Sequence, residues 1–248
     1  MSRTFSYSGI ALRVRSSGES NRQAWFLTPE AGVIEAVVFG GPKSHLRASV
    51  SQFHQGKLLL YHDPVKDSWK VTDFDVQSWR PGIREHYSRL CGAGAIAETL
   101  LASYGSGGNW EDSYARTGMT LDALSDATGR NCRGIVLHFL WKWIDLLGQK
   151  PALDRCDSCE RPVPVPETMH YVPADGVLIC TECIEHRNDW NIAVGPGARR
   201  WLNTIEHLSP DLLFRYTADT ISLSQVKTLV TELLAGIIGK RLRTWDEV

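Results

Sequence analysis

Between residues 7 and 76, short apolar runs alternate with stretches rich in Gly, Pro, Asn, Asp and Ser. These residues favour turns because they supply positive φ, a fixed φ or local side-chain hydrogen bonds. Five such runs in about seventy residues fit a small, partly open OB-type barrel better than a sandwich, which usually needs seven or more strands. The predicted strands are Ile10–Arg15, Gln23–Thr28, Val33–Phe39, Lys57–His62 and Trp69–Val76.

After Pro81-Gly82 the apolar residues recur at helical spacing, which predicts an all-α region. The segment from residue 134 to 147 is apolar on nearly all sides, so we expect it inside a helix bundle. Gly118 is a candidate break in the second helix. Residues 156–183 interrupt the helices with a Pro-rich insert, and the last helices are expected to complete the same bundle. The predicted helices are Tyr87–Gly105, Asn109–Thr128, Gly134–Leu147, Ala198–Leu208, Pro210–Ala218 and Leu223–Ile238.

The insert carries two C-x2-C pairs separated by twenty residues. Each pair lets two thiolates of one tight turn face one ion, and two pairs complete the tetrahedron that Zn²⁺ prefers. Four thiolates leave no open position for substrate, so the predicted zinc is structural. Four unconnected thiols or a redox pair are the alternatives. The predicted zinc ligands, one ion per chain, are Cys156, Cys159, Cys180 and Cys183.

The other two cysteines, Cys91 and Cys132, stand alone in predicted helices and are expected to be buried thiols. His170 and His186 lie near the array and are expected at the surface. The whole chain is therefore predicted to be α+β: an N-terminal five-stranded OB-type β-barrel, then an all-α domain with an inserted four-cysteine zinc module. The predicted boundaries are 1–80 for the barrel, 81–155 and 187–248 for the helical domain, and 156–186 for the zinc module.

Composition places the chain among globular proteins, with 43% hydrophobic and 22% charged residues. The formal net charge of −1 argues against coating nucleic acid through bulk positive charge, so any DNA site must be a local patch. Residues 1–80 have ten Lys and Arg against seven Asp and Glu, residues 81–155 have eight against eight, and residues 156–248 have nine against thirteen. Contact with phosphates is therefore expected at the N-terminal end.

The N-terminal sequence lacks the apolar stretch and cleavage site of a secretory signal, and no run approaches about 18 uninterrupted apolar residues. The protein is therefore expected to be cytosolic. In that reducing compartment cysteines are more often thiols or metal ligands than disulfides.

Alternation in the first predicted strand places Ile10, Leu12 and Val14 on one face and Arg13 with Arg15 on the other. Two guanidiniums on one strand face can track a phosphate backbone, although an ordinary solvated face has the same pattern. Basic residues in neighbouring turns can extend the patch. The candidate DNA-contacting residues are Arg13, Arg15, Arg22, Lys43, His45 and Arg47.

Aromatic residues of the barrel could provide stacking platforms for single strands or could belong to the core. The candidates are Trp25, Phe39 and Trp69. In the helical region, Arg84, Arg89, Arg130 and Arg133 could form a second basic surface, and Arg199-Arg200 another; solvated helix faces are the alternative for each.

The stretch Gly41-Pro42-Lys43-Ser44 is similar to the end of a P-loop, but it lacks Gly directly before the Lys, and Pro42 has no N–H to hold a phosphate. The deaminase signature is also missing, because no His-x-Glu pair occurs. With no Ser/His/Asp grouping or paired carboxylates, the chain is predicted not to be an enzyme.

The order of parts resembles the bacterial RecO family along essentially the full chain. Residues 9–13, 18–22 and 27–32 resemble the opening strand, acidic turn and second turn of that family. Residues 147–159, LGQKPALDRCDSC, resemble the segment that leads into its zinc module, "LG-x-x-P-x-L-x-x-C-x-x-C", and this long match is the most specific. Residues 40–44 stand where relatives carry a Gly-rich basic loop.

The resemblance implies a non-enzymatic recombination mediator in DNA repair, located in the cytoplasm at the nucleoid. It would bind single- and double-stranded DNA, anneal strands, act with RecR, and contact the tail of single-strand DNA-binding protein so that RecA can load. Two points of comparison with the family affect these expectations. The basic loop has only Lys43, with His45 and Arg47 following, so weaker DNA binding than in a typical relative is expected. Some branches lack the cysteines, which favours a structural metal.

The alternative from another class is a zinc-ribbon adaptor that binds only protein and uses its barrel as a scaffold. A salt-dependent titration with single-stranded DNA separates the two hypotheses, because phosphate contacts release counterions and an adaptor would show no such dependence.

Overall fold

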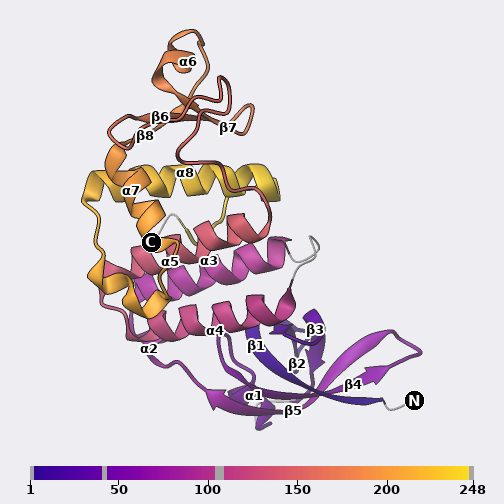
Figure 1. Ribbon diagram of the computed structural model, residues 1–248. Coiled ribbons are helices and arrows are strands. Elements are labelled where there is room, and N and C mark those ends of the chain that lie inside the picture. Colours follow the sequence, from indigo (N-terminus) through magenta and orange to yellow (C-terminus); the bar gives the residue numbers. More distant parts are fainter. Residues whose placement is uncertain (1–2, 41–43, 104–108, 246–248) are drawn as a thin grey trace. The chain divides into compact units, whose positions relative to one another are not determined.

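The computed structural model describes residues 3–40, 44–103 and 109–245 (Figure 1). The chain falls into two compact units, which we describe separately. The barrel unit comprises Met1–Ala93 and Leu100–Asp126, and the helical unit comprises Gly94–Thr99 and Ala127–Val248. Helix α3 (Tyr87–Ser103) contributes residues to both.

The barrel unit contains a closed five-stranded barrel in the order β1-β2-β3-β5-β4. Its neighbouring strands are antiparallel except for β3 and β5, which are parallel, and β1 closes the barrel by pairing with β4. The predicted OB-type barrel is thus confirmed. All five predicted strands are present, most of them longer than expected. They are β1 (Thr4–Ser17), β2 (Asn21–Thr28), β3 (Gly32–Val38), β4 (Gln55–Asp63) and β5 (Ser68–Ser78).

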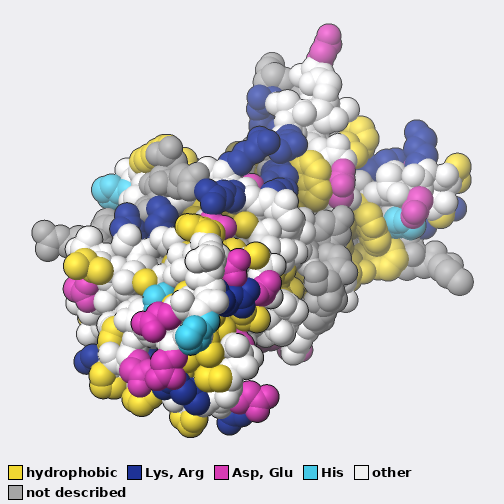
Figure 2. Space-filling view, turned by 90° about the horizontal axis from the view of Figure 1, so that it is seen from above, with side chains coloured by type: hydrophobic (Ala, Val, Ile, Leu, Met, Phe, Trp, Pro, Cys, Tyr) yellow, Lys and Arg dark blue, Asp and Glu magenta, His cyan; other side chains and the backbone are white. Residues whose placement is uncertain are grey.

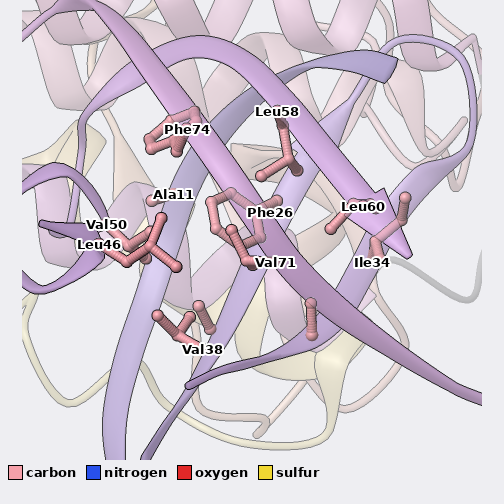
Figure 3. Close-up of a cluster of buried hydrophobic side chains, with 12 residues drawn as sticks. Ala11, Phe26, Ile34, Val38, Leu46, Val50, Leu58, Leu60, Val71 and Phe74 are labelled. Atoms are coloured by element: carbon pink, nitrogen blue, oxygen red, sulfur yellow. The ribbon is translucent and has the colours of Figure 1, made fainter. Parts of the chain in front are cut away.

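Inward-facing side chains of all five strands fill the barrel (Figure 3). The rings of Phe26 and Phe74 meet edge to face with their centroids 5.5 Å apart, a favourable arrangement for aromatic pairs. The short helix α1 (Leu46–Ser49) adds Leu46, and Val50 follows directly after it, so both close the cluster next to Ala11. This helix was not predicted from the sequence.

The inward face of β1 differs from the sequence prediction, which placed Ile10, Leu12 and Val14 together. Ala11 belongs to the barrel cluster and Val14 packs against it, whereas Ile10 and Leu12 are buried but lie outside that cluster. The reason is an irregularity in the pairing with β2, where the register shifts between Ala11 and Arg13. A bulge of this kind reverses the alternation of a strand, so the predicted face was wrong.

Two helices, α2 (Gly82–Glu85) and α4 (Trp110–Asp126), complete the barrel unit. The expected break in the second predicted helix does not occur, and α4 is continuous through Gly118. The glycine instead permits close approach: a Cβ there would lie 3.1 Å from Oε1 of Gln55. Close packing of α4 on the barrel, rather than a helix end, explains this glycine.

The helical unit includes α5 (Gly129–Leu146), α7 (Pro196–Ile205), the 3₁₀ helix η2 (Pro210–Arg215) and α8 (Thr220–Ile238), besides part of α3. Residues 135–141 of α5 are all buried, which confirms its predicted place inside the bundle. The segment predicted as Pro210–Ala218 is only the short η2, consistent with the limited length of 3₁₀ helices.

Helix α8 is, in the described part of the chain, the one helix long and apolar enough to cross a membrane by length and composition. It packs against α5, α7 and a short strand, and Val226, Leu229 and Val230 are fully buried. Those contacts are typical of the core helix of a folded unit, not of a membrane span.

The helical unit also contains a three-stranded antiparallel sheet that was not predicted. Its strands are β6 (Met169–Val172), β7 (Val177–Cys180) and β8 (Ile192–Val194), with helix α6 (Thr181–Glu185) after β7. Strands of three or four residues have too few positions to show an alternating pattern, which explains why the sequence did not reveal them.

Candidate metal centre and nucleic-acid interface

The four predicted zinc ligands come together. One pair, Cys156 and Cys159, lies in the turn before β6, and Cys180 ends β7 while Cys183 lies in α6. All four sulfur atoms lie within 4.8 Å of one another, so they could hold one metal ion.

The sulfur–sulfur distances fit a tetrahedral site. The Sγ atoms of Cys156 and Cys183 are 3.8 Å apart, and those of Cys159 and Cys180 are 3.9 Å apart. A tetrahedron with metal–sulfur bonds of about 2.3 Å has edges of about 3.8 Å. A disulfide would need about 2.05 Å, so these cysteines are free thiols in a metal-binding arrangement.

Backbone N–H groups prepare the site for thiolates. Burial disfavours the thiolate of Cys156, but the N–H groups of Cys159, Cys180 and Ser158 outweigh it and lower the pKa of this thiol to about 6. The N–H of Cys180 lies 3.3 Å from the Cys156 Sγ. Burial and the neighbouring thiols raise the pKa of Cys183 to about 12.

A neighbouring cation can balance the charge of such a cluster. Arg161 donates from Nη2 to Glu167 at 2.8 Å, and its pKa is raised by its hydrogen bonds to Glu167 and to Cys180. The nearby histidines are not ligands: Nδ1 of His170 lies 2.9 Å from Asn191, and His186 is exposed. The other two cysteines, Cys91 and Cys132, are buried as predicted.

A basic hollow lies on the barrel unit beside β1 and β2, with a volume of about 300 Å³. Three arginines from separate parts of the sequence meet there, and none of the residues that line it is Asp or Glu. We call this site the basic hollow. Its lining consists of Val14, Arg15, Ser16, Arg22, Ser51, Gln52, Phe53, Arg84 and Leu90.

Main-chain carbonyls hold two of these guanidiniums. Nη2 of Arg22 donates to the carbonyl of Leu46 at 2.9 Å, and Nη2 of Arg84 donates to the carbonyl of Gln52 at 2.6 Å and to Oγ of Ser51 at 3.2 Å. These contacts fix the positions of the positive charges without neutralising them.

The surroundings disfavour the charged form of two arginines of the basic hollow, Arg22 and Arg84. Burial lowers the pKa of Arg22, and the positive charge of Arg47 lowers it further. Burial also lowers the pKa of Arg84. Among residues 3–40, 44–103 and 109–245, none of Arg15, Arg22, Arg47 and Arg84 forms an ion pair with a carboxylate. An anion bound here would offset the electrostatic cost of burying these positive charges and of placing them close together.

The predicted DNA-contacting residues fall into several groups. Arg15 and Arg22 line the basic hollow, and Arg47 is exposed and acts on Arg22. Arg13 is half-buried with its guanidinium 6.0 Å from the centre of the Trp25 ring. His45 is exposed and lies 3.4 Å from Asp73. Lys43, with the rest of residues 41–43, lies outside the described residues.

Sequence reasoning missed the place of Arg84, which it grouped with other arginines of the helical region. The signal available was its distance along the chain from the last barrel strand, only six residues after Ser78. Two other arginines considered as surface candidates are less exposed than expected: Arg89 is half-buried and Arg199 is buried. Arg89 donates to the carbonyls of Gly82 and Ser125 at 3.0 and 2.8 Å, and Arg199 is 3% exposed.

The three aromatic residues considered as stacking platforms lie in different surroundings. Trp25 donates from Nε1 to Glu35 at 3.1 Å, and Trp69 packs against the barrel core and against His62, 4.5 Å from ring to ring. Phe39 is 47% exposed, and its ring centre lies 5.9 Å from Nζ of Lys70. On the face shown in Figure 2, acidic, basic and hydrophobic side chains are interspersed, in keeping with the small net charge.

Comparison with known proteins gives consistent matches along the chain. Residues 1–72 match the family model described as "Recombination protein O N terminal", and residues 84–246 match "Recombination protein O C terminal". Similar proteins named "DNA repair protein RecO" include one from Moorella thermoacetica, 25% identical over 242 residues (97% of this chain, 88% of the relative). Another, from Heliobacterium modesticaldum, is 26% identical over 253 residues (99% and 89%), and one from Gloeobacter violaceus is 27% identical over 186 residues (74% and 70%).

Proposed function

Because this chain belongs to the recombination protein O (RecO) family of DNA repair proteins, we propose that it is a non-enzymatic recombination mediator that binds single- and double-stranded DNA through its barrel. The DNA contacts are phosphate contacts made from the basic hollow. Arg15, Arg22 and Arg84 supply them, Arg47 adds charge beside Arg22, and Arg13 and His45 extend the contact, together with Lys43, which stands two residues before His45 in the sequence.

The unpaired arginines of the basic hollow carry this proposal. Arg22 is half-buried and has no carboxylate partner among the described residues, which is costly unless an anion joins it, while the exposed Arg15 and Arg84 add positive charge without such a partner. The planar guanidinium suits phosphate oxygens because it offers paired donors in a fixed fork. Residues 1–80 also hold the excess of positive charge in a chain whose net charge is −1. A protein-only adaptor would have no need for this arrangement.

The wider role follows from the family. The protein anneals complementary strands, acts with RecR, and contacts the tail of single-strand DNA-binding protein so that RecA can load on the coated strand. It works in the cytoplasm at the nucleoid. The chemistry is binding and exchange, and the chain catalyses no covalent step.

The cysteine cluster holds one structural Zn²⁺ per chain in this proposal. Support comes from the four sulfur donors and their tetrahedral spacing, which suit zinc. When bound, the ion would tie the turn before β6 to the start of α6. Cys156, Cys159, Cys180 and Cys183 fill its coordination shell, while Arg161 offsets part of their negative charge.

The test of DNA binding is a salt titration with single-stranded DNA. Arg15→Gln with Arg47→Gln removes two exposed charges that make no ion pair with a described residue, so the fold should be retained. The slope of log affinity against log salt should shrink by about 0.7 for each phosphate that the protein no longer neutralises. Lys57→Gln with Lys66→Gln removes the same charge from exposed positions that do not line the basic hollow and should leave the slope nearly unchanged.

Two outcomes would contradict this proposal. If the wild-type protein binds DNA without any salt dependence, or binds none, the adaptor alternative is favoured. If the two double variants have the same slope, the phosphates contact another surface.

A further inference from the structure

Trp79 is a large aromatic residue that the fold leaves half exposed. It follows β5, and 50% of its surface is accessible. One side of its indole packs edge to face on His54, with ring centres 4.7 Å apart at 68°. Its carbonyl accepts a hydrogen bond from Nη1 of Arg84 at 3.4 Å. The residue is therefore positioned by its neighbours while much of its ring surface stays in solvent.

The next residue fixes the main chain at this point. Arg80 is buried, has a φ of 45°, and donates four hydrogen bonds, to Asp122, Phe53, Gln55 and Gly118. A main chain held in this way presents the Trp79 ring in a defined orientation. An anchored ring loses little freedom when a ligand packs on it, which favours binding.

The main chain of Trp79 lies next to the basic hollow. Arg84, which bonds the Trp79 carbonyl, also bonds Ser51 and Gln52 of the hollow lining. Leu90, another lining residue, is 40% exposed. The residue that carries this accessible ring is thus bonded through its main chain to Arg84, which has no carboxylate partner in the described chain and lines the hollow with Arg15 and Arg22. Single-strand binding sites combine these two elements, because cations follow the backbone and rings stack on bases.

We propose that Trp79 stacks on an unpaired base and thereby makes the barrel prefer single-stranded over double-stranded DNA. The inference rests on the proposed function, in which the basic hollow holds the phosphates. Phosphate contacts alone discriminate poorly between the two forms of DNA. A base inside a duplex already has both faces covered by its neighbours, so stacking an indole on it would first require unstacking the duplex, whereas a base of a single strand is open to the ring.

Two other exposed aromatic residues, Phe39 and Trp190, lack this combination. Phe39 faces Lys70, whose ammonium is 3.2 Å from the carboxylate of Asp63 and is therefore neutralised. Trp190 is 63% exposed but belongs to the helical unit and does not line the basic hollow. It provides a matched control of the same residue type and similar exposure.

The experiment compares Trp79→Leu, Trp79→Phe and Trp190→Leu in the full-length protein, with a single-stranded and a double-stranded oligonucleotide. Leucine keeps apolar bulk against His54 but removes the aromatic face. Trp79→Leu should weaken single-strand binding about 5- to 100-fold, and leave both double-strand affinity and the salt slope nearly unchanged. Trp79→Phe should restore most of the affinity, and Trp190→Leu should have no effect.

A second measurement changes the DNA in place of the protein, so that a folding defect cannot mimic the result. Wild-type protein should bind a strand of abasic sites more weakly than a strand with bases, whereas Trp79→Leu should show little of that difference. If Trp79→Leu discriminates bases as well as the wild type does, or weakens both DNA forms equally, the inference is wrong. The proposed function would still stand in that case, because it is tested separately by Arg15→Gln with Arg47→Gln.

Discussion

The guanidinium of Arg80 donates from Nε to Oδ1 of Asp122 at 2.7 Å, which ties the end of the barrel to helix α4. Its other nitrogens donate to the carbonyls of Phe53 and Gly118 and to the side chain of Gln55. Arg80 is 4% exposed, whereas the Asp122 side chain is 58% exposed. Arg80 therefore stabilises the fold mainly by donating hydrogen bonds to buried carbonyls, and the ion pair contributes less.

Arg80→Ala should destabilise the protein by about 2–4 kcal/mol, because two buried carbonyls lose their donor. Asp122→Ala should cost less, about 1–2 kcal/mol, since this carboxylate is largely solvated although its loss leaves the buried Arg80 without an anionic partner. Chemical denaturation of both variants measures the difference. Equal costs would show that the ion pair, and not the carbonyl contacts, carries the stability.

Local patterns were sufficient to predict most of the fold. The five strands were recognisable because turn residues such as those around Gly18 and Gly32 separate them, and both glycines have positive φ, at 70° and 69°. The inward face of β1 could not be predicted, because the bulge between Ala11 and Arg13 arises from pairing with β2. Register irregularities depend on partners that a single strand's sequence does not identify.

The two candidate sites also differ in how well the sequence predicted them. The cysteine cluster was predictable because the ligand spacing lies within the sequence itself. The role of each arginine was not, since charge patterning does not reveal which distant carbonyls will surround a guanidinium. Arg84 and Arg199 both stand in helices, yet Arg84 lines a solvent-facing hollow and Arg199 is buried. Only the tertiary arrangement distinguishes them.

Zinc analysis provides the next prediction. Protein purified without chelator should contain one zinc ion per chain, and Cys156→Ser should lower that content and destabilise the segment around the cluster. Metal affinity contributes directly to folding in so small a module. Cys91→Ala removes a buried thiol outside the cluster and should keep one zinc per chain. Wild-type protein without any metal would contradict the proposed site.

Acid should weaken the cap of helix α8. Asp219 accepts hydrogen bonds from the N–H of Ser222 at 2.9 Å and from its hydroxyl at 2.6 Å, and these bonds lower the pKa of the carboxyl. A folded-state pKa below the unfolded one means that the stabilisation is complete above the unfolded pKa of about 3.9. It is lost as the pH falls through the lower folded-state pKa.

Asp219→Asn keeps an acceptor for the cap but removes the charge. The variant should melt at a lower temperature than the wild type at pH 7, and the gap should close as the pH falls below about 4. Thermal unfolding at a series of pH values measures this difference in melting temperature between the variant and the wild type. Glu19→Gln, which removes an exposed carboxylate from the turn after β1, should show no such convergence. A gap that stays constant at low pH would exclude the charge as its cause.

Arg199 organises the segment that leads into the cysteine cluster. Its guanidinium donates to the carbonyl of Leu153 at 2.8 Å, of Val163 at 2.6 Å, of Pro164 at 2.9 Å and of Glu167 at 2.6 Å. Burial lowers its pKa, and four carbonyl oxygens compensate for the lost hydration. A planar fork can reach several carbonyls at once, which a single ammonium group cannot.

Arg199→Lys should therefore destabilise the protein by about 2–4 kcal/mol, despite conserving the charge, because at least one or two buried carbonyls lose their donor. Arg200, the next residue, is exposed, and Arg200→Lys should change stability by less than about 0.5 kcal/mol. Because the two substitutions are chemically identical and adjacent, their difference isolates the effect of the buried contacts. Chemical denaturation measures it, and zinc content measured in parallel shows whether the cluster loosens with the segment. If Arg199→Lys were as stable as Arg200→Lys, lysine or water would have to replace all four hydrogen bonds.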